Sequence, residues 1–233
     1  MRNTNKTKNT EFIFQDWGLT EYNVALQRQE TLFRKIIDEK KANFPTENYL
    51  IFCEHPNVYT LGKSGDEKNM LLNLIQLQTA DAQFVRTSRG GDITYHGPGQ
   101  IVGYPIFDLE NFGLGLKQYI FKIESVIIDL LAHYEIFAAR LAGATGVWID
   151  PDTPRARKIC AIGVRSSHFV TMHGFALNVN TDLTFFNHIN PCGFTDKAVT
   201  SMQKELKCNI DLEDVKKRLY QKFNFTTKNT KNT

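Results

Sequence analysis

The chain has 233 residues, 42% hydrophobic and 23% charged, the composition of an ordinary globular protein that folds without disulfides or metal. Lys and Arg number 28 against 25 acidic residues, but five of the basic ones lie in the tails, so the body is slightly acidic and nucleic-acid binding is disfavoured. No run reaches the ~18 apolar residues of a membrane span, and the basic N-terminus has no apolar signal segment, so we predict a cytoplasmic protein.

Residues 1–11 and 226–233 are rich in Asn, Thr and Lys, and we predict solvated, mobile tails around a single domain at 12–225. Apolar residues at helical spacing predict helices at 19–37, 114–134 and near 211–223. Short apolar runs predict strands at 49–53, 84–87, 101–107, 146–149, 158–164, 168–172 and 175–179.

Pro105 favours an edge position or a strand end for 101–107, because proline cannot donate to a sheet ladder. Helices and groups of strands alternate along the chain without regular strand–helix–strand units. This order predicts an α+β fold with a mostly antiparallel or mixed sheet flanked by helices.

The first unusual stretch is SRGGDITYHGPGQ, residues 88–100. Glycine permits positive φ angles and a close approach of backbone to a ligand. A tight hairpin between two strands is the ordinary interpretation, and the neighbouring Arg89 and His96 favour a binding loop instead. The stretch matches neither GxxxxGK[ST] nor GxGxxG, so no nucleotide-binding motif is present.

The second stretch is INPCGF, residues 189–194, where Pro191 and Gly193 flank Cys192 in a predicted loop. A free cysteine is most often a buried filler, whereas this loop context favours a reactive thiol. Only the thiolate is nucleophilic, so a reactive Cys192 needs a cation, a base or a helix N-terminus nearby. Lys158 begins an apolar strand within a basic cluster. That cluster is either a solvated charge run or the source of this cation.

The other cysteines and the histidines carry weaker signals. Cys53 and Cys160 lie in apolar runs and are predicted to be buried hydrophobes. No close pair of metal ligands is present, so no metal site is predicted. His96 and His173 lie in glycine-containing stretches and are better candidates for a pocket than the remaining histidines.

Several segments, in this order, resemble the signature segments of the lipoyl(octanoyl) transferase family. They are RGGDITYHGPGQIVGYP at 89–105, RKICAIGVR at 157–165, VTMHGFALNVN at 170–180 and INPCGF at 189–194, preceded by the similar segments at 17–29 and 53–64. The resemblance covers roughly residues 12–205. It implies a mixed sheet flanked by helices, as in the catalytic domains of biotin and lipoate protein ligases.

The resemblance also implies roles for individual residues. Cys192 matches the family's catalytic cysteine, and Lys158 matches the lysine that activates it. The matched substrate-binding positions are Arg89, Gly90, Gly91, Asp92, Ile93, Thr94, Tyr95, His96, Ala161, Ile162, Gly163, Gly174, Phe175 and Ala176.

The implied reaction carries an octanoyl or lipoyl group from acyl carrier protein, through a Cys192 thioester, to a lysine of a lipoyl domain. The expected acceptors are the lipoyl domains of 2-oxoacid dehydrogenase E2 subunits and the glycine cleavage H protein. The reaction is the first step of lipoate cofactor assembly. Neither ATP nor a metal is expected, because a thioester is already activated.

Three other functions remain open. An ATP-dependent lipoate–protein ligase has a distantly similar glycine-rich segment and needs no cysteine nucleophile. A non-catalytic acyl-binding or lipoyl-domain-binding module would have kept only the fold. A cysteine hydrolase would use water in place of the amine.

Overall fold

The computed structural model describes residues 8–190 and 198–223. The large sheet contains β1 (Ile13–Leu19), β2 (Tyr49–Glu54), β6 (Gln100–Ile106), β7 (Ala138–Leu141), β8 (Ala144–Ile149), β9 (Arg157–Ser167), β10 (Val170–Asn178) and β11 (Ala198–Val199). The small sheet contains β3 (Val58–Leu61), β4 (Gln83–Arg86) and β5 (Ile93–His96).

The helices are α1 (Tyr22–Lys41), α2 (Leu74–Thr79), α3 (Leu109–Phe112), α4 (Leu116–His133), α5 (Met202–Leu206) and α6 (Leu212–Lys222). Two 3₁₀ helices, η1 (Glu67–Asn69) and η2 (Leu183–His188), lie in connections. Among the helices of the described ranges, none has the length and apolarity that a membrane span requires.

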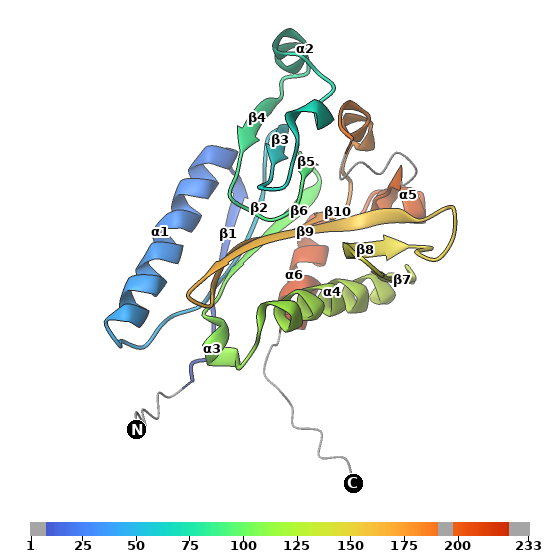
Figure 1. The fold of residues 1–233 in the computed structure, drawn as a ribbon. Coiled ribbons are helices and arrows are strands. Elements are labelled where there is room, and N and C mark those ends of the chain that lie inside the picture. The colour runs from blue at the N-terminus through green and yellow to red at the C-terminus, as the bar shows by residue number, and fades with distance from the viewer. Residues whose placement is uncertain (1–7, 191–197, 224–233) are drawn as a thin grey trace.

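Both sheets are mixed, as the sequence predicts. The large sheet has the order β1-β2-β6-β10-β9-β8-β7, with β11 on β9. Its β1–β2 and β9–β11 pairs are parallel and the other pairs antiparallel. The small sheet, in the order β4-β3-β5, forms a separate lobe above the large one (Figure 1).

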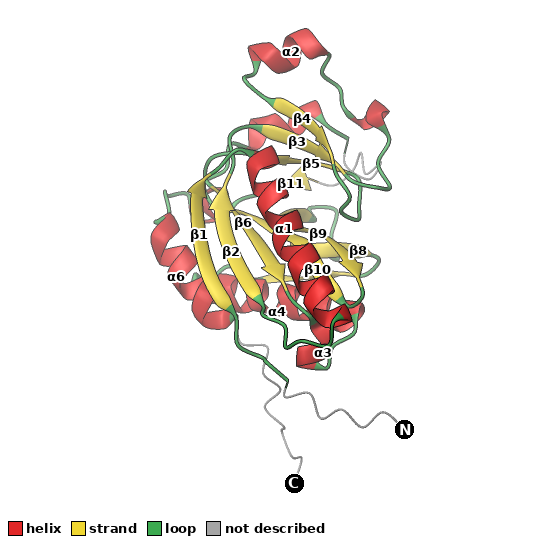
Figure 2. Ribbon diagram, turned by 90° about the vertical axis from the view of Figure 1, so that its left-hand side faces the viewer, coloured by secondary structure: helices red, strands yellow, loops and turns green. Residues whose placement is uncertain are grey.

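The two faces of the large sheet are covered by different helices, as Figure 2 shows. On one face, α1 buries Ala25, Phe33 and Ile36 against β2, β6 and β10. On the other face, α4 buries an apolar stripe that includes Ile123 and Ile127, and α6 packs beside it. Burial of these stripes, at ~25 cal/mol per Å² of apolar surface, is the main stabilising contribution.

Some predicted elements differ in detail from the observed ones. The first predicted helix begins at Tyr22 rather than at residue 19, because Leu19 ends β1 and is 64% exposed. The strand at 101–107 corresponds to β6, which lies between β2 and β10 and is therefore no edge strand. Of the two positions that Pro105 favours, the structure shows the strand end, because β6 ends at Ile106. Pro105 is tolerated there because the ladder with β10 stops at Gly103, so β10 needs no N–H from Pro105, although β2 still pairs with it at Leu50.

The strands predicted at 168–172 and 175–179 form one strand, β10, whose hairpin with β9 turns at His168 and Phe169. Both turn residues have positive φ, 53° and 62°, which is the backbone of a type I′ turn. Because neither residue is glycine or asparagine, the sequence carries no local signal for this turn.

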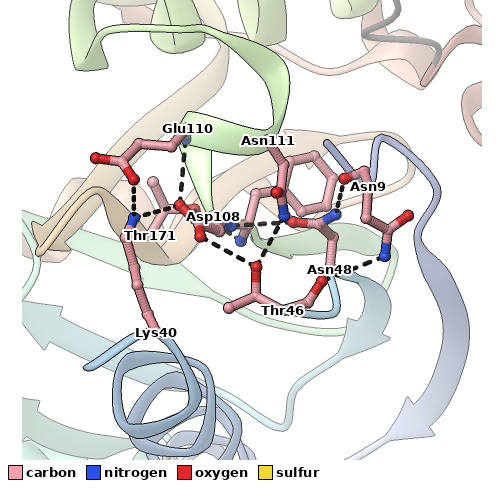
Figure 3. Close-up of polar contacts among 9 residues, drawn as sticks. Asn9, Lys40, Thr46, Asn48, Asp108, Glu110, Asn111 and Thr171 are labelled. Atoms are coloured by element: carbon pink, nitrogen blue, oxygen red, sulfur yellow. Dashed lines mark hydrogen bonds and ion pairs between the residues drawn. The ribbon is translucent and has the colours of Figure 1, made fainter. Parts of the chain in front are cut away.

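A buried polar network holds the end of α1 against the start of α3 (Figure 3). The Asp108 carboxylate accepts from Lys40 Nζ at 2.5 Å and from Thr46 Oγ1 at 3.0 Å. Asn48 accepts from the Asp108 backbone N–H and donates to the backbone oxygen of Asn9. These hydrogen bonds connect four segments of the chain. Both oxygens of the buried Asp108 carboxylate have a partner, as buried polar groups require.

Candidate active site

A cavity of about 450 Å³ lies between the large sheet and the loop that leads into β5. Its floor is flat because four small residues form two directly opposed cross-strand pairs, Ala161 with Ala176 and Gly163 with Gly174. Opposed residues of an antiparallel pair project to the same face of a sheet. Two neighbouring strands therefore form an apolar trough in the range of small-molecule pockets.

The glycine-rich loop lies directly on this floor. Gly90 N–H donates to the backbone oxygen of Val164 at 2.9 Å. A Cβ at Gly163 would stand 2.9 Å from the Gly90 oxygen, and Gly91 has a φ of +88°. As expected from the sequence, these glycines allow the backbone of the loop to lie close to the sheet and to adopt a positive φ angle.

A directed hydrogen-bond chain crosses one wall of the cavity. Arg89, 8% exposed, donates through Nε and a terminal nitrogen to Thr60 Oγ1. Since Thr60 Oγ1 accepts from a group that can only donate, its own hydrogen goes to His96 Nε2, 3.3 Å away. The His96 hydrogen then lies on Nδ1, which donates to Gln100 Oε1 at 2.8 Å. Gln100 in turn donates to Asn178 Oδ1 at 2.9 Å.

The chain fixes His96 as a neutral imidazole, and burial favours the same state. Burial, with the neighbouring His55 as a smaller cause, lowers the pKa of His96 to about 3. Burial also lowers the pKa of His173 to about 3 and that of His55 to about 4. These three side chains are therefore neutral near pH 7. Among the described residues that line the cavity, the basic side chains are those of Arg89 and Lys158.

Lys158 lies near the start of β9 and lines the cavity. Its Nζ stands 4.6 Å from the centroid of the Trp148 ring. Val199 of β11 is its Cα partner, and Thr200 N–H donates to its backbone oxygen at 2.9 Å. Asn178, the last member of the polar chain, donates to the Thr200 oxygen. The series of hydrogen bonds that begins at Arg89 on one wall of the cavity thus ends beside Lys158.

Cys192 lies outside the described residues, and so do residues 1–7 and 224–233, which include most of the predicted tails. Asn190, before this gap, donates its N–H to the Asn69 oxygen at 2.8 Å. Ala198, after the gap, pairs with Arg157 beside Lys158. Cys53 and Cys160 are buried, as predicted.

The structure brings together thirteen of the fourteen predicted pocket residues. Tyr95 is the exception. Its side chain packs in the apolar cluster of the small sheet, on the face of β5 opposite to Thr94 and His96. Its ring stacks on Phe185 with centroids 4.8 Å apart, and its hydroxyl donates to Asn57.

Sequence reasoning missed several other residues that line the cavity: Tyr22, Gln100, Val102, Tyr104, Gly143, Ala144, Thr145, Trp148, Asn178, Phe186, Ala198 and Val199. Tyr22 opens the first helix and Trp148 lies in a predicted strand, but neither position signals a cavity locally. Within the described part of the chain, no group of three His, Cys, Asp or Glu side chains is arranged to hold a metal.

Comparison with known proteins gives a consistent assignment. Residues 21–224 match the family model of the lipoyl protein ligase A/B catalytic domain. An octanoyltransferase of Bacteroides fragilis is 58% identical over 207 residues, covering 89% of this chain and 94% of the relative. An octanoyltransferase of Cytophaga hutchinsonii is 49% identical over 245 residues, covering 100% and 99% of the two chains.

Two solved structures share the fold at low identity. A bi-partite lipoate protein ligase of Thermoplasma acidophilum has a TM-score of 0.67 at 14% identity, covering 92% of this chain and 83% of that one. A lipoate-protein ligase A bound with ATP has a TM-score of 0.62 at 13% identity, covering 91% and 82%. The α+β fold predicted from the sequence is thereby confirmed.

The chain belongs to the lipoyl protein ligase A/B catalytic-domain family. Its identity to curated octanoyltransferases along most of its length makes it an acyltransferase that transfers octanoyl groups in lipoate biosynthesis.

Proposed function

We propose that the octanoyl transfer proceeds in two steps through a thioester on Cys192. In the first step, the Cys192 thiolate attacks the carbonyl carbon of octanoyl-acyl carrier protein, and the carrier leaves as a thiolate that takes up a proton. In the second, a lysine amine of a lipoyl domain attacks the enzyme thioester. An amide forms, the amine loses a proton, and the Cys192 sulfur is released.

Lys158 is the group that activates the thiol in this proposal. An ammonium beside a cysteine stabilises the thiolate and lowers the thiol pKa. Once this ammonium has given its proton to the departing carrier thiolate, the neutral Lys158 amine accepts a proton from the attacking lysine. The single observation that carries the proposal is that Lys158 lines the same cavity as the trough of Ala161 and Ala176. Lys158 also pairs with Val199 of β11, a strand that begins six residues after Cys192 in the sequence.

The trough is the proposed site of the acyl chain. From Lys158 to Gly163, β9 advances by five residue-to-residue steps, or about 16 Å, which is longer than an extended eight-carbon chain needs. Each buried methylene contributes ~0.8 kcal/mol, so chains of neighbouring length are only partly distinguished. The predicted pocket residues around Arg89 and Phe175 would enclose the chain.

The proposed acceptors are the lipoyl domains of 2-oxoacid dehydrogenase E2 subunits and the glycine cleavage H protein. The Thermoplasma acidophilum ligase that shares this fold was described with its E2 lipoyl domain. The reaction needs neither ATP nor a metal, because exchange of a thioester and its aminolysis are not uphill. A cytoplasmic reaction fits the free thiols of Cys53, Cys160 and Cys208.

The first test is intact-mass analysis after incubation with octanoyl-acyl carrier protein and no ATP. The wild type should gain one octanoyl group, which Cys192→Ser should not gain. The matched variant Cys208→Ser, altered at an exposed cysteine, should be acylated normally. An adduct on Cys192→Ser would refute the thioester assignment.

The second test concerns Lys158. Lys158→Ala should form the acyl-enzyme at least ~100-fold more slowly, while Lys204→Ala should behave as wild type. Equal rates in all three proteins would remove Lys158 from the mechanism. Adding a lipoyl domain should then yield the amide. Release of free octanoate in its place would indicate the hydrolase instead, and a strict requirement for ATP and free octanoate would indicate the ligase.

A further inference from the structure

Trp148 and Lys158 occupy directly opposed positions in the antiparallel pair of β8 and β9. Their side chains therefore lie on the same face, with Lys158 Nζ 4.6 Å from the indole centroid. The ring has one orientation available, because it is 2% exposed and its Nε1–H donates to the Ala144 oxygen at 3.0 Å. The lysine thus extends along a fixed aromatic surface.

Gly146 provides the other side of this slot. Its φ is +123°, and a Cβ there would stand 2.6 Å from the Cys160 oxygen and 3.4 Å from Lys158 Cε. Its N–H donates to the buried carboxylate of Glu124 at 3.1 Å. The other Glu124 oxygen accepts from Arg140 Nε at 2.9 Å. The slot for the lysine stem is therefore braced from α4 as well as from the sheet.

We propose that Trp148 is a positioning residue for octanoyl transfer, whose indole face seats the Lys158 ammonium at the cavity wall and favours its charged form. A cation is attracted to the negative face of an aromatic ring, most strongly to that of tryptophan. A lysine stem has several freely rotating bonds, and seating it removes unproductive rotamers. The inference rests on the proposed role of Lys158 and names the residue that supports it.

A merely structural Trp148 would affect stability and leave the ionisation of Lys158 unchanged. The distinguishing measurement is the pH profile of acylation, whose alkaline limb reports loss of the ammonium. Removal of the indole face should move that limb to lower pH and slow acylation roughly 3- to 30-fold. The two effects should appear together, because both arise from the same contact.

The experiment measures acylation of the full-length protein by an octanoyl-pantetheine thioester from pH 6 to 10. Acylation should be fastest in the wild type, slower in Trp148→Phe, which keeps an aromatic face, and slowest in Trp148→Leu. The matched control, Phe112→Leu, removes a buried ring elsewhere and should lower the thermal midpoint with an unchanged alkaline limb. An unshifted limb in Trp148→Leu would overturn the proposal.

Fluorinated tryptophan gives a test that does not depend on how well Trp148→Leu folds. The chain has two tryptophans, so in a Trp17→Phe background only Trp148 is labelled. Successive fluorination weakens the negative ring face while nearly preserving its shape, and the alkaline limb should move stepwise to lower pH. An unchanged limb throughout the series would also overturn the proposal.

Failure of the proposed function remains distinguishable. If Lys158→Ala is acylated as fast as wild type, the role of Lys158 itself is refuted. If Lys158→Ala is slow and the Trp148 variants match wild type, only the seating by Trp148 is refuted. In the double variant, Trp148→Leu should slow acylation no further than Lys158→Ala alone.

Discussion

Lowering the pH from 7.5 to 5 should destabilise the protein strongly, because His55, His96 and His173 are buried as neutral imidazoles. Burial lowers their pKa values to about 4, 3 and 3, against about 6.5 in an unfolded chain. The folded pKa is the lower one in each case. Their contribution to stability is therefore complete above pH 6.5 and is lost as the pH falls toward 4, since only the unfolded chain binds protons there.

The magnitude follows from the size of this window. At pH 5 an unfolded histidine lies about 1.5 units below its pKa, and each unit corresponds to 1.36 kcal/mol. Each buried imidazole thus costs about 2 kcal/mol, and the three together cost at most ~6 kcal/mol. That loss is a large part of the free energy of unfolding of a typical domain, which is ~5–15 kcal/mol. Protonation of carboxylates changes the free energy of unfolding mainly at pH values below this range.

The assay is denaturant unfolding at several pH values, with the free energy of unfolding extrapolated at a constant m-value. The wild type should lose roughly 3–6 kcal/mol between pH 7.5 and 5. His55→Gln has one buried imidazole fewer, so its pH-dependent loss should shrink by about 2 kcal/mol even if it is less stable at pH 7.5. A wild-type loss below ~1 kcal/mol, or ring resonances of these histidines that titrate near pH 6.5 in the folded protein, would refute the reasoning.

Further substitutions probe packing, ion pairing and the trough. Gly103→Ala should lower the free energy of unfolding by roughly 1–3 kcal/mol, because the new Cβ would stand 2.0 Å from the Phe175 ring; an unchanged denaturant midpoint would contradict this. Arg157→Met should lower the free energy of unfolding by ~1–3 kcal/mol, since the guanidinium donates to two carboxylates. In 1 M salt the difference in this free energy between variant and wild type should become smaller. A difference independent of salt would argue against an ionic origin. Ala176→Leu should reduce kcat/KM for octanoyl relative to hexanoyl donors roughly tenfold, and an unaltered ratio would place the acyl chain elsewhere.

The elements with strong periodicity were predictable because one local property governs them. The apolar stripe of 114–134 corresponds to α4, and the run at 49–53 to β2. Cys53 and Cys160 were predictable as buried residues, since each lies in a continuous apolar run. The glycines at 90 and 91 indicated a close backbone approach, for which few other residues are suited.

What the sequence by itself determined is therefore the three long helices, several central strands of the large sheet, and the small and glycine-rich residues that line part of the cavity. Tertiary structure decided which of them meet. The β8–β9 register places Trp148 opposite Lys158, alternation along β5 turns Tyr95 away from the cavity, and the strand with Pro105 becomes central. Strand order and register depend on packing between segments far apart in the chain. The local sequence pattern of one strand therefore does not indicate which strand pairs with it or in which register.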